Sequence, residues 1–311
     1  MEKVKNRRIA IIGAGALGVM YGNIFNQNKK QDVISFLADA DRVLRYQKEG
    51  IFLNGVRQEF DIRSTDQIEK PYDLILIAVK FHQLEEALSI AEKAAGEHTI
   101  FLSVLNGISS EEKMAERFGE KNVLDCCVQG MDALKKGNQF FCSNTGTVSI
   151  GMRIPGQEER LTFVESFLKD MKINYTVYED MKHQLWKKLM LNAGVNQASV
   201  VFDVPYGGIQ KEGMARVMTI EAMKEVKRVA QYEDVFLTEE EINQWMKVID
   251  SLNPEGMPSM RQDILAKRPT ELSLFAGTIR QKGKEFGVQT PVNDYFYEGI
   301  RLMEKNRGIL S

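Results

Sequence analysis

Lys188, Asn192 and Asn196 stand four positions apart in a segment that is otherwise mostly apolar. Residues at this spacing share one face of an α-helix, which predicts a polar stripe of roughly 12 Å along the helix axis. A helix that is apolar nearly all round is usually buried. Because a buried ammonium and two buried amides need polar partners, the stripe either joins a hydrogen-bond network between helices or faces a ligand.

A second chemical signal, the pattern G-x-G-x-x-G, follows the apolar run 8–12 and precedes a helix-like stretch, 16–28. Between a strand and a helix this pattern predicts a dinucleotide-binding turn, where backbone N–H groups and the helix dipole meet the pyrophosphate. A glycine-rich turn without a ligand is the alternative. The residues predicted to bind the cofactor here are Gly13, Gly15, Ala16, Leu17 and Gly18.

The end of the second predicted strand carries conflicting cofactor signals. Asp39 lies about twenty residues beyond the glycine loop, where a carboxylate that binds the ribose 2′-hydroxyl of NAD(H) belongs. Arg42, a few residues later, would suit the 2′-phosphate of NADP(H). Asp39 is also a good helix cap, which would need no ligand.

Strands alternating with helices over the first half of the chain predict an α/β, Rossmann-like domain with a parallel sheet. Asn54–Gly55 predicts a hairpin turn between strands 51–53 and 59–62. The predicted strands are 8–12, 33–37, 74–79, 99–105, 123–128, 147–151 and 173–177. The predicted helices are 16–28, 41–49, 82–95 and 109–118.

After about Glu179 the pattern becomes all-helical, which predicts two domains. Residues 1–179 form the dinucleotide-binding Rossmann domain, and residues 180–311 form an all-α substrate and catalytic domain. The predicted helices of the second domain are near 181–200, 212–232, 238–251, 259–267, 270–286 and 291–306.

Composition argues against several classes of partner. The formal net charge of −2 gives no electrostatic case for nucleic acid or an anionic membrane. No apolar run approaches the ~18–20 residues of a membrane span, and the charged N-terminus lacks the features of a secretory signal.

Cys126, Cys127 and Cys142 fit neither a disulfide framework nor a metal site, so we expect free thiols, no metal and a cytoplasmic location.

Several short motifs, in this order and spacing, resemble those of the ketopantoate reductase (2-dehydropantoate 2-reductase) family. The resemblance spans nearly the whole chain. The motifs are Gly13–Gly18, Ala78-Val-Lys80, Leu105-Asn-Gly107, Trp186-Lys-Lys188-Leu with Asn192 and Asn196, and Ser259-Met-x-Gln-Asp263 followed by Thr270-Glu271.

The resemblance implies a Rossmann domain, a helical domain and an active site in the cleft between them. It implies reduction of ketopantoate to pantoate with NADPH, on the route to pantothenate. Lys188 matches the general acid, and Glu271 matches the acidic residue near the carbonyl. The other implied contacts are Asn192, Asn196 and Ser259 to the substrate, Lys80 to the cofactor, and Asn106 to the cofactor near the reaction centre.

The implied chemistry is consistent with the residue types. Hydride addition places negative charge on a carbonyl oxygen, which a nearby ammonium stabilises and protonates. Glu271 would hold Lys188 charged and in position. Each residue also has a structural explanation: a surface lysine for Lys80, a turn for Asn106, a helix cap for Ser259 and a favourable helix dipole for Glu271.

Two departures from the family pattern bear on specificity. Ala38-Asp39 stands where family members often have arginine, which puts an NADPH preference in doubt. Tyr206 precedes Gly207 where some members have asparagine, which removes one polar contact to the substrate.

The alternatives are reduction of another 2-oxo acid, an opine-type or hydroxyacid dehydrogenase of the same layout, and a dinucleotide sensor without catalysis. A sensor would be expected to lack Lys188 and Glu271, and an opine-type enzyme needs an amine-donor site for which no motif is present. We therefore expect an NAD(P)H-dependent oxidoreductase acting on a small 2-oxo acid. A homodimer would need an exposed apolar face on the C-terminal helices, which the sequence does not single out.

Overall fold

The computed structural model describes residues 6–309, so residues 1–5 of the charged N-terminus lie outside the described part. The chain divides into two compact units. The N-terminal unit comprises Met1–Leu105 and Ser109–Met181, and the C-terminal unit comprises Asn106–Ile108 and Lys182–Ser311.

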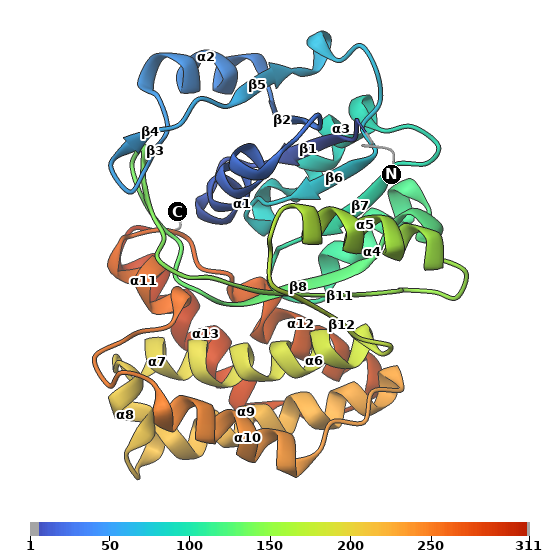
Figure 1. The fold of residues 1–311 in the computed structure, drawn as a ribbon. Coiled ribbons are helices and arrows are strands. Elements are labelled where there is room, and N and C mark those ends of the chain that lie inside the picture. The colour runs from blue at the N-terminus through green and yellow to red at the C-terminus, as the bar shows by residue number, and fades with distance from the viewer. Residues whose placement is uncertain (1–5, 310–311) are drawn as a thin grey trace. The chain divides into compact units, whose positions relative to one another are not determined.

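A five-stranded parallel sheet with strand order β5-β2-β1-β6-β7 organises the N-terminal unit (Figure 1). Its strands are β1 (Arg8–Ile12), β2 (Val33–Ala38), β5 (Asp61–Ser64), β6 (Leu74–Ile77) and β7 (Ile100–Ser103). The helices of the unit are α1 (Ala16–Asn28), α2 (Ala40–Glu49), α3 (Leu84–Ala94), α4 (Ser109–Phe118) and α5 (Glu158–Asp170). The predicted fold class, a Rossmann-like domain followed by a helical domain, is confirmed.

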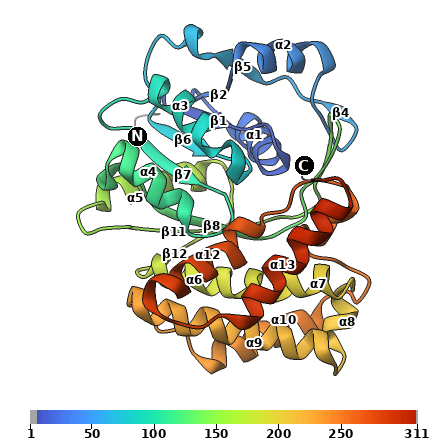
Figure 2. The ribbon, with the colours of Figure 1, turned by 180° about the vertical axis from the view of Figure 1, so that it is seen from behind.

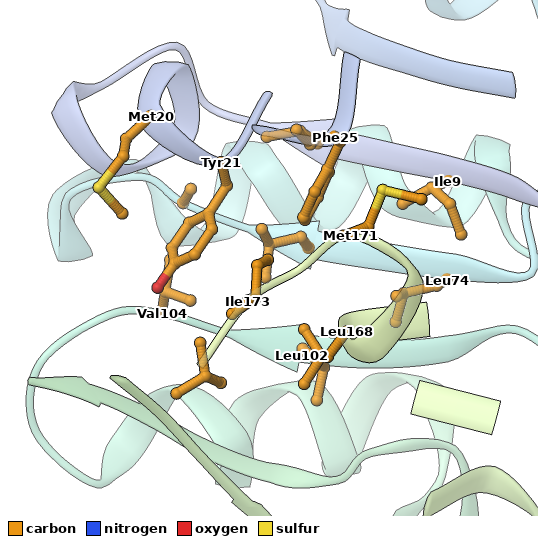
Figure 3. Packing of buried hydrophobic residues seen from close by; sticks show 14 of the residues in the cluster. Ile9, Met20, Tyr21, Phe25, Leu74, Leu102, Val104, Leu168, Met171 and Ile173 are labelled. Carbon is orange, nitrogen blue, oxygen red and sulfur yellow. The ribbon is translucent and has the colours of Figure 1, made fainter. Parts of the chain in front are cut away.

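Both faces of this sheet are buried, which explains why its central strands are apolar at nearly every position. Successive side chains of a strand point to opposite faces, so Ile9 and Ile11 enter one core and Ala10 and Ile12 the other. In Figure 3, Tyr21 and Phe25 of α1 point into the first core, where Phe25 also packs edge-on against Phe167 of α5. Helices α3 and α4 cover the second face (Figure 2).

Two smaller sheets complete the unit. The first has the order β12-β11-β8, built from β8 (Asp125–Met131), β11 (Thr145–Gly151) and β12 (Tyr175–Val177). The second has the order β4-β3-β10-β9, built from β3 (Phe52–Leu53), β4 (Val56–Arg57), β9 (Leu134–Lys136) and β10 (Gln139–Phe141). Helix α5 and the β9–β10 hairpin were not among the predicted elements.

The predicted hairpin is correct in its turn but wrong in its second strand. Asn54 and Gly55 have positive φ angles of 49° and 80°, which is the geometry of a two-residue turn. Such a turn pairs the residues immediately beside it, so β3 pairs with β4 at 56–57 instead of with 59–62. The segment Asp61–Ser64 joins the edge of the main sheet, parallel to β2.

The C-terminal unit is helical, and no strand is found between residues 182 and 309. Helices α6 and α7 lie in line, with α9 beside them (Figure 1), and α12 packs on α13 (Figure 2). The elements are α6 (Met181–Leu191), a π-helical turn (Asn192–Asn196), α7 (Gln197–Val201), α8 (Tyr206–Gln210), α9 (Met214–Ala230), α10 (Glu239–Ser251), α11 (Ser259–Leu265), α12 (Ala276–Phe286) and α13 (Pro291–Asn306). Across residues 6–309, no helix combines the length and apolar character needed to span a membrane.

Glu111 in α4 makes the stability of the N-terminal unit depend on pH. Burial, with a smaller contribution from Asp125, raises the pKa of Glu111 from 4.5 to about 8. The folded chain therefore holds a proton that the unfolded chain releases, so stability is lost as the pH rises from about 4.5 to 8. We expect Glu111→Gln to raise the free energy of unfolding by about 2 kcal/mol at pH 8 and much less at pH 5.

Denaturant unfolding at both pH values measures this effect. Glu116→Gln, an exposed change on the same helix, is the control and should leave the pH dependence unaltered. A Glu111→Gln curve parallel to that of the wild type over pH 5–8 would show that Glu111 does not titrate in this range.

Candidate functional site

The polar stripe lies on a helix that changes its winding midway. The prediction of one regular helix over 181–200 is wrong at Asn192–Asn196, where the backbone forms a π-helical turn. Gly194 packs closely against α9, since a Cβ there would lie 2.8 Å from Met223 Cγ and 2.9 Å from the Thr219 carbonyl oxygen. Gln197 Nε2 donates to the Ala193 carbonyl at 2.7 Å, so a side chain satisfies a carbonyl of the turn. Single π-turns inside α-helices are frequent at functional sites.

Both asparagines and Ser259 form one connected network. Asn196 Nδ2 donates to Asn192 Oδ1 at 3.0 Å. Asn196 Oδ1 accepts from Ser259 Oγ and from the backbone N–H of Met260, each at 3.2 Å. Pro258 is the N-cap residue of α11, and the Ser259 hydroxyl bonds to Asn196 instead of capping the helix. The start of α11 is thereby fixed against the π-helical turn.

Two buried donors of the stripe have no acceptor. Lys188 and Asn192 are 7% and 8% exposed. Within residues 6–309, neither Lys188 Nζ nor Asn192 Nδ2 has a hydrogen-bond partner. A buried donor without an acceptor costs about 1–3 kcal/mol, and more when it is charged. An anionic or carbonyl-bearing ligand would supply the acceptors that these atoms lack.

Glu271 and Asn106 meet although 165 positions separate them in the chain. Asn106 Nδ2 donates to Glu271 Oε2 at 2.8 Å, and Glu271 is buried. Both residues belong to the C-terminal unit. No hydrogen bond joins Glu271 to Lys188, because Lys188 Nζ has no hydrogen-bond partner among the described residues. Glu271 instead orients the amide of Asn106.

Each glycine of the G-x-G-x-x-G loop can be assigned a separate steric role. Gly13 has a φ of 109°, and a Cβ there would lie 2.5 Å from the Ala78 carbonyl oxygen. A Cβ at Gly18 would lie 1.9 Å from the Gly13 carbonyl oxygen. The fold itself therefore requires glycine at both positions, for the tight turn and for close packing of helix and strand.

Gly15 differs, because the fold does not require a glycine there. Its φ is −81°, in the extended region, and the nearest atom to an added Cβ would be the Ala78 carbonyl oxygen at 3.5 Å, an ordinary contact. Helix α1 begins directly after it, with no side-chain cap and no acidic residue in its first turn. The first N–H groups of a helix have no partner within the helix, and beside a position open to close approach they fit a pyrophosphate.

At the end of β2, the structure shows Asp39 as a helix cap. Asp39 Oδ1 accepts from the backbone N–H of Arg42 at 2.8 Å. The Arg42 guanidinium donates to both carboxylate oxygens of Glu86, at 2.6 and 3.0 Å, and lies 3.1 Å from Asp39 Oδ2. Asp39 and Arg42, which favoured different cofactors in the sequence, thus form one row of ion pairs with Glu86. The sequence analysis did not identify Glu86.

Two lysines are associated with the glycine loop. Lys80 follows the strand next to β1, and Lys135 contacts the loop directly. That strand is β6, and Lys80 is half-buried at the start of the short turn Phe81–Gln83. Lys135 of β9 places Nζ 3.4 Å from the Ala14 carbonyl oxygen in the loop itself. Sequence reasoning missed Lys135, since only the packing of β9 and β10 brings it there.

The cysteines and acidic residues show no second chemical centre in the described residues. Cys126 and Cys127 are buried, and Cys142 is half-buried with a pKa that is raised to about 11, mainly by burial. Among residues 6–309, no group of His, Cys, Asp and Glu could hold a metal ion.

Family models decide the chain's classification. The model "Ketopantoate reductase PanE/ApbA" matches residues 9–153, and "Ketopantoate reductase PanE/ApbA C terminal" matches residues 180–304. The chain belongs to the ketopantoate reductase PanE/ApbA family. It is therefore an NAD(P)H-dependent oxidoreductase of that family, as the sequence predicted.

Curated relatives are similar over almost their full length. The chain is 25% identical to the 2-dehydropantoate 2-reductase of Streptococcus pyogenes, covering 91% of this chain and 93% of the relative. It is 26% identical to the 2-dehydropantoate 2-reductase of Pyrococcus abyssi, covering 97% and 99%. These similarities support membership of the family.

Solved structures extend the comparison to a different dehydrogenase. D-mandelate dehydrogenase, solved with NADH and anilino(oxo)acetate, is 25% identical to this chain. The match has a TM-score of 0.86 and covers 97% of this chain and 99% of that one. The 2-dehydropantoate 2-reductase of Geobacter metallireducens shares the fold, with a TM-score of 0.81 at 21% identity.

Proposed function

We propose that this protein reduces a 2-oxo carboxylate to a 2-hydroxy acid, with residues 1–179 binding the dinucleotide and residues 180–311 binding the substrate. The observation that carries this proposal is the buried Lys188 ammonium without an acceptor. A site whose strongest buried donor lacks a partner is suited to an oxygen that gains negative charge during the reaction. The bound nicotinamide dinucleotide supplies the hydride.

In this proposal Lys188 stabilises the developing alkoxide and donates its proton to the former carbonyl oxygen. Asn192 Nδ2, one turn further along the helix, offers a second donor to the substrate. Ser259 and Asn196, already bonded to each other, hold the carboxylate end. Glu271 orients Asn106, whose amide would contact the nicotinamide end of the cofactor or the reacting carbonyl.

Ketopantoate is the first candidate substrate, because both family models and the curated relatives bear its name. An aromatic 2-oxo acid is the second, favoured by the likeness to D-mandelate dehydrogenase and by Tyr206. Tyr206 donates its backbone N–H to the Gly256 carbonyl at 2.9 Å, and its ring packs against Gly256, three positions before Ser259. Burial raises the pKa of Tyr206.

Turnover of a substrate panel tests the proposal. The purified protein is mixed with NADH or NADPH and with ketopantoate, benzoylformate or 4-methyl-2-oxopentanoate, and oxidation of the cofactor is followed. A kcat/KM at least about tenfold higher for ketopantoate supports the first candidate, and the reverse order supports the second. Binding of a dinucleotide without turnover of any 2-oxo acid would overturn the proposal and leave the sensor alternative.

A further inference from the structure

The row formed by Asp39, Arg42 and Glu86 lies beside the end of β2. In proteins of this fold, residues at that place distinguish a ribose 2′-hydroxyl from a 2′-phosphate. Strands β2 and β6 both pair in parallel with β1, so the segments that follow them flank the glycine loop at the same edge of the sheet. Asp39 follows β2, and Glu86 stands in the first turn of α3 after β6. In this fold the residue at the end of the second strand meets the adenosine ribose.

The geometry of the row leaves Asp39 able to accept another hydrogen bond. Its Oδ1 caps α2 and its Oδ2 lies 3.1 Å from Arg42, while the side chain remains 40% exposed. A carboxylate has about four acceptor positions, so a ribose hydroxyl can donate to Asp39 without breaking the cap.

Arg42, by contrast, is paired with carboxylates through both terminal nitrogens. Its two terminal nitrogens form a bidentate pair with Glu86, the strongest common geometry for an arginine. Two carboxylates and one guanidinium give the row a net charge of −1 before any cofactor binds. A 2′-phosphate would compete with Glu86 for Arg42 and would also face the charge of Asp39.

We propose that Glu86 makes this protein prefer NADH over NADPH by holding the Arg42 guanidinium in an ion pair. A 2′-phosphate that took the place of Glu86 on Arg42 would lie beside two carboxylates, those of Asp39 and Glu86. Glu86 is a positioning residue, since it acts through Arg42. This inference rests on the proposed function only in that the glycine loop binds a dinucleotide.

Dissociation constants for NADH and NADPH, measured by nicotinamide fluorescence without any 2-oxo acid, test the inference. The wild type should bind NADH at least about tenfold more tightly. Glu86→Gln should tighten NADPH binding about tenfold and change NADH binding less than about twofold, because it releases Arg42 and removes one negative charge. Adding Arg42→Ala to Glu86→Gln should abolish the gain for NADPH.

Glu92→Gln is the matched control. Glu92 stands on the same helix and forms a bidentate pair with Arg117 at 2.6 and 2.9 Å, with a side-chain exposure of 49% against 46% for Glu86. Its loss should leave the ratio of the two dissociation constants unchanged. Asp39→Asn keeps a good helix cap while removing the charge, and should weaken NADH binding about tenfold.

Equal binding of the two cofactors by the wild type, or an unchanged ratio in Glu86→Gln, would overturn the inference. These outcomes are distinguishable from failure of the proposed function. Selective NADH binding without turnover of any 2-oxo acid contradicts the reaction and leaves the role of Glu86 standing. Binding of neither dinucleotide contradicts both.

Discussion

Lys188→Met should lower kcat by about 10²–10⁴-fold while leaving the folded protein at least as stable as the wild type. The rate falls because the variant retains the volume of the side-chain stem but offers neither charge nor proton to the reacting oxygen. Stability is maintained or increased by about 1–3 kcal/mol, since the substitution removes a buried donor without an acceptor. Cofactor affinity should stay within about twofold, because in our proposal Lys188 contacts the reacting carbonyl and the glycine loop holds the dinucleotide.

Single-turnover kinetics and thermal unfolding measure the two effects on the same sample. Lys187→Met is a close control, because Lys187 stands on the same helix and pairs with Glu241 at 3.3 Å. That variant should lose a little stability and no more than about twofold in rate. A Lys188→Met enzyme with a rate near that of the wild type would show that another group is the acid.

Gly15→Ala should weaken dinucleotide binding about 10–100-fold without changing the melting temperature. The protein tolerates a methyl group there, because its nearest neighbour would be 3.5 Å away and the backbone is extended. The bound pyrophosphate does not tolerate it, since the methyl group occupies the position from which the phosphates approach the loop. A steric cost of about 1–3 kcal/mol corresponds to the stated range.

Gly18→Ala separates the two roles of glycine in this loop. A Cβ at Gly18 would lie 1.9 Å from the Gly13 carbonyl oxygen, so the loop must distort and the melting temperature must fall. Equilibrium binding followed by calorimetric unfolding of both variants distinguishes the cases. If Gly15→Ala binds NADH or NADPH as tightly as the wild type, the loop does not hold the pyrophosphate as we propose.

Local patterns predicted the regular parts of the fold. Strands buried on both faces are apolar at each position, as in β6, and the helices of the C-terminal unit repeat apolar residues at helical spacing. The glycine loop is readable for the same reason, because its steric demands fall on neighbouring residues and on the strand beside them. Lys188, Asn192 and Asn196 were found by spacing alone.

Features that depend on contacts between distant segments were not predictable. The π-helical turn follows from the packing of Gly194 on α9, which a regular helical pattern does not reveal. The segment 59–62 was predicted as the second strand of a hairpin, because nothing in those residues specifies that the observed strand, Asp61–Ser64, pairs with β2. Helix α5 and the β9–β10 hairpin likewise lacked a clear local signal.

The sequence by itself determined the two-unit α/β and helical plan, the glycine loop and the polar spacing of Lys188, Asn192 and Asn196. These depend on periodicity, turn chemistry and residue type, which act over a few neighbouring positions. Asn106, Ser259 and Glu271 were predicted from the family resemblance and not from local pattern. Only the tertiary structure decided that Asn106 meets Glu271, that Lys188 lacks a partner and that Arg42 is held by Glu86. Hydrogen bonds and ion pairs depend on the distance between side chains, and folding, not order along the chain, sets those distances.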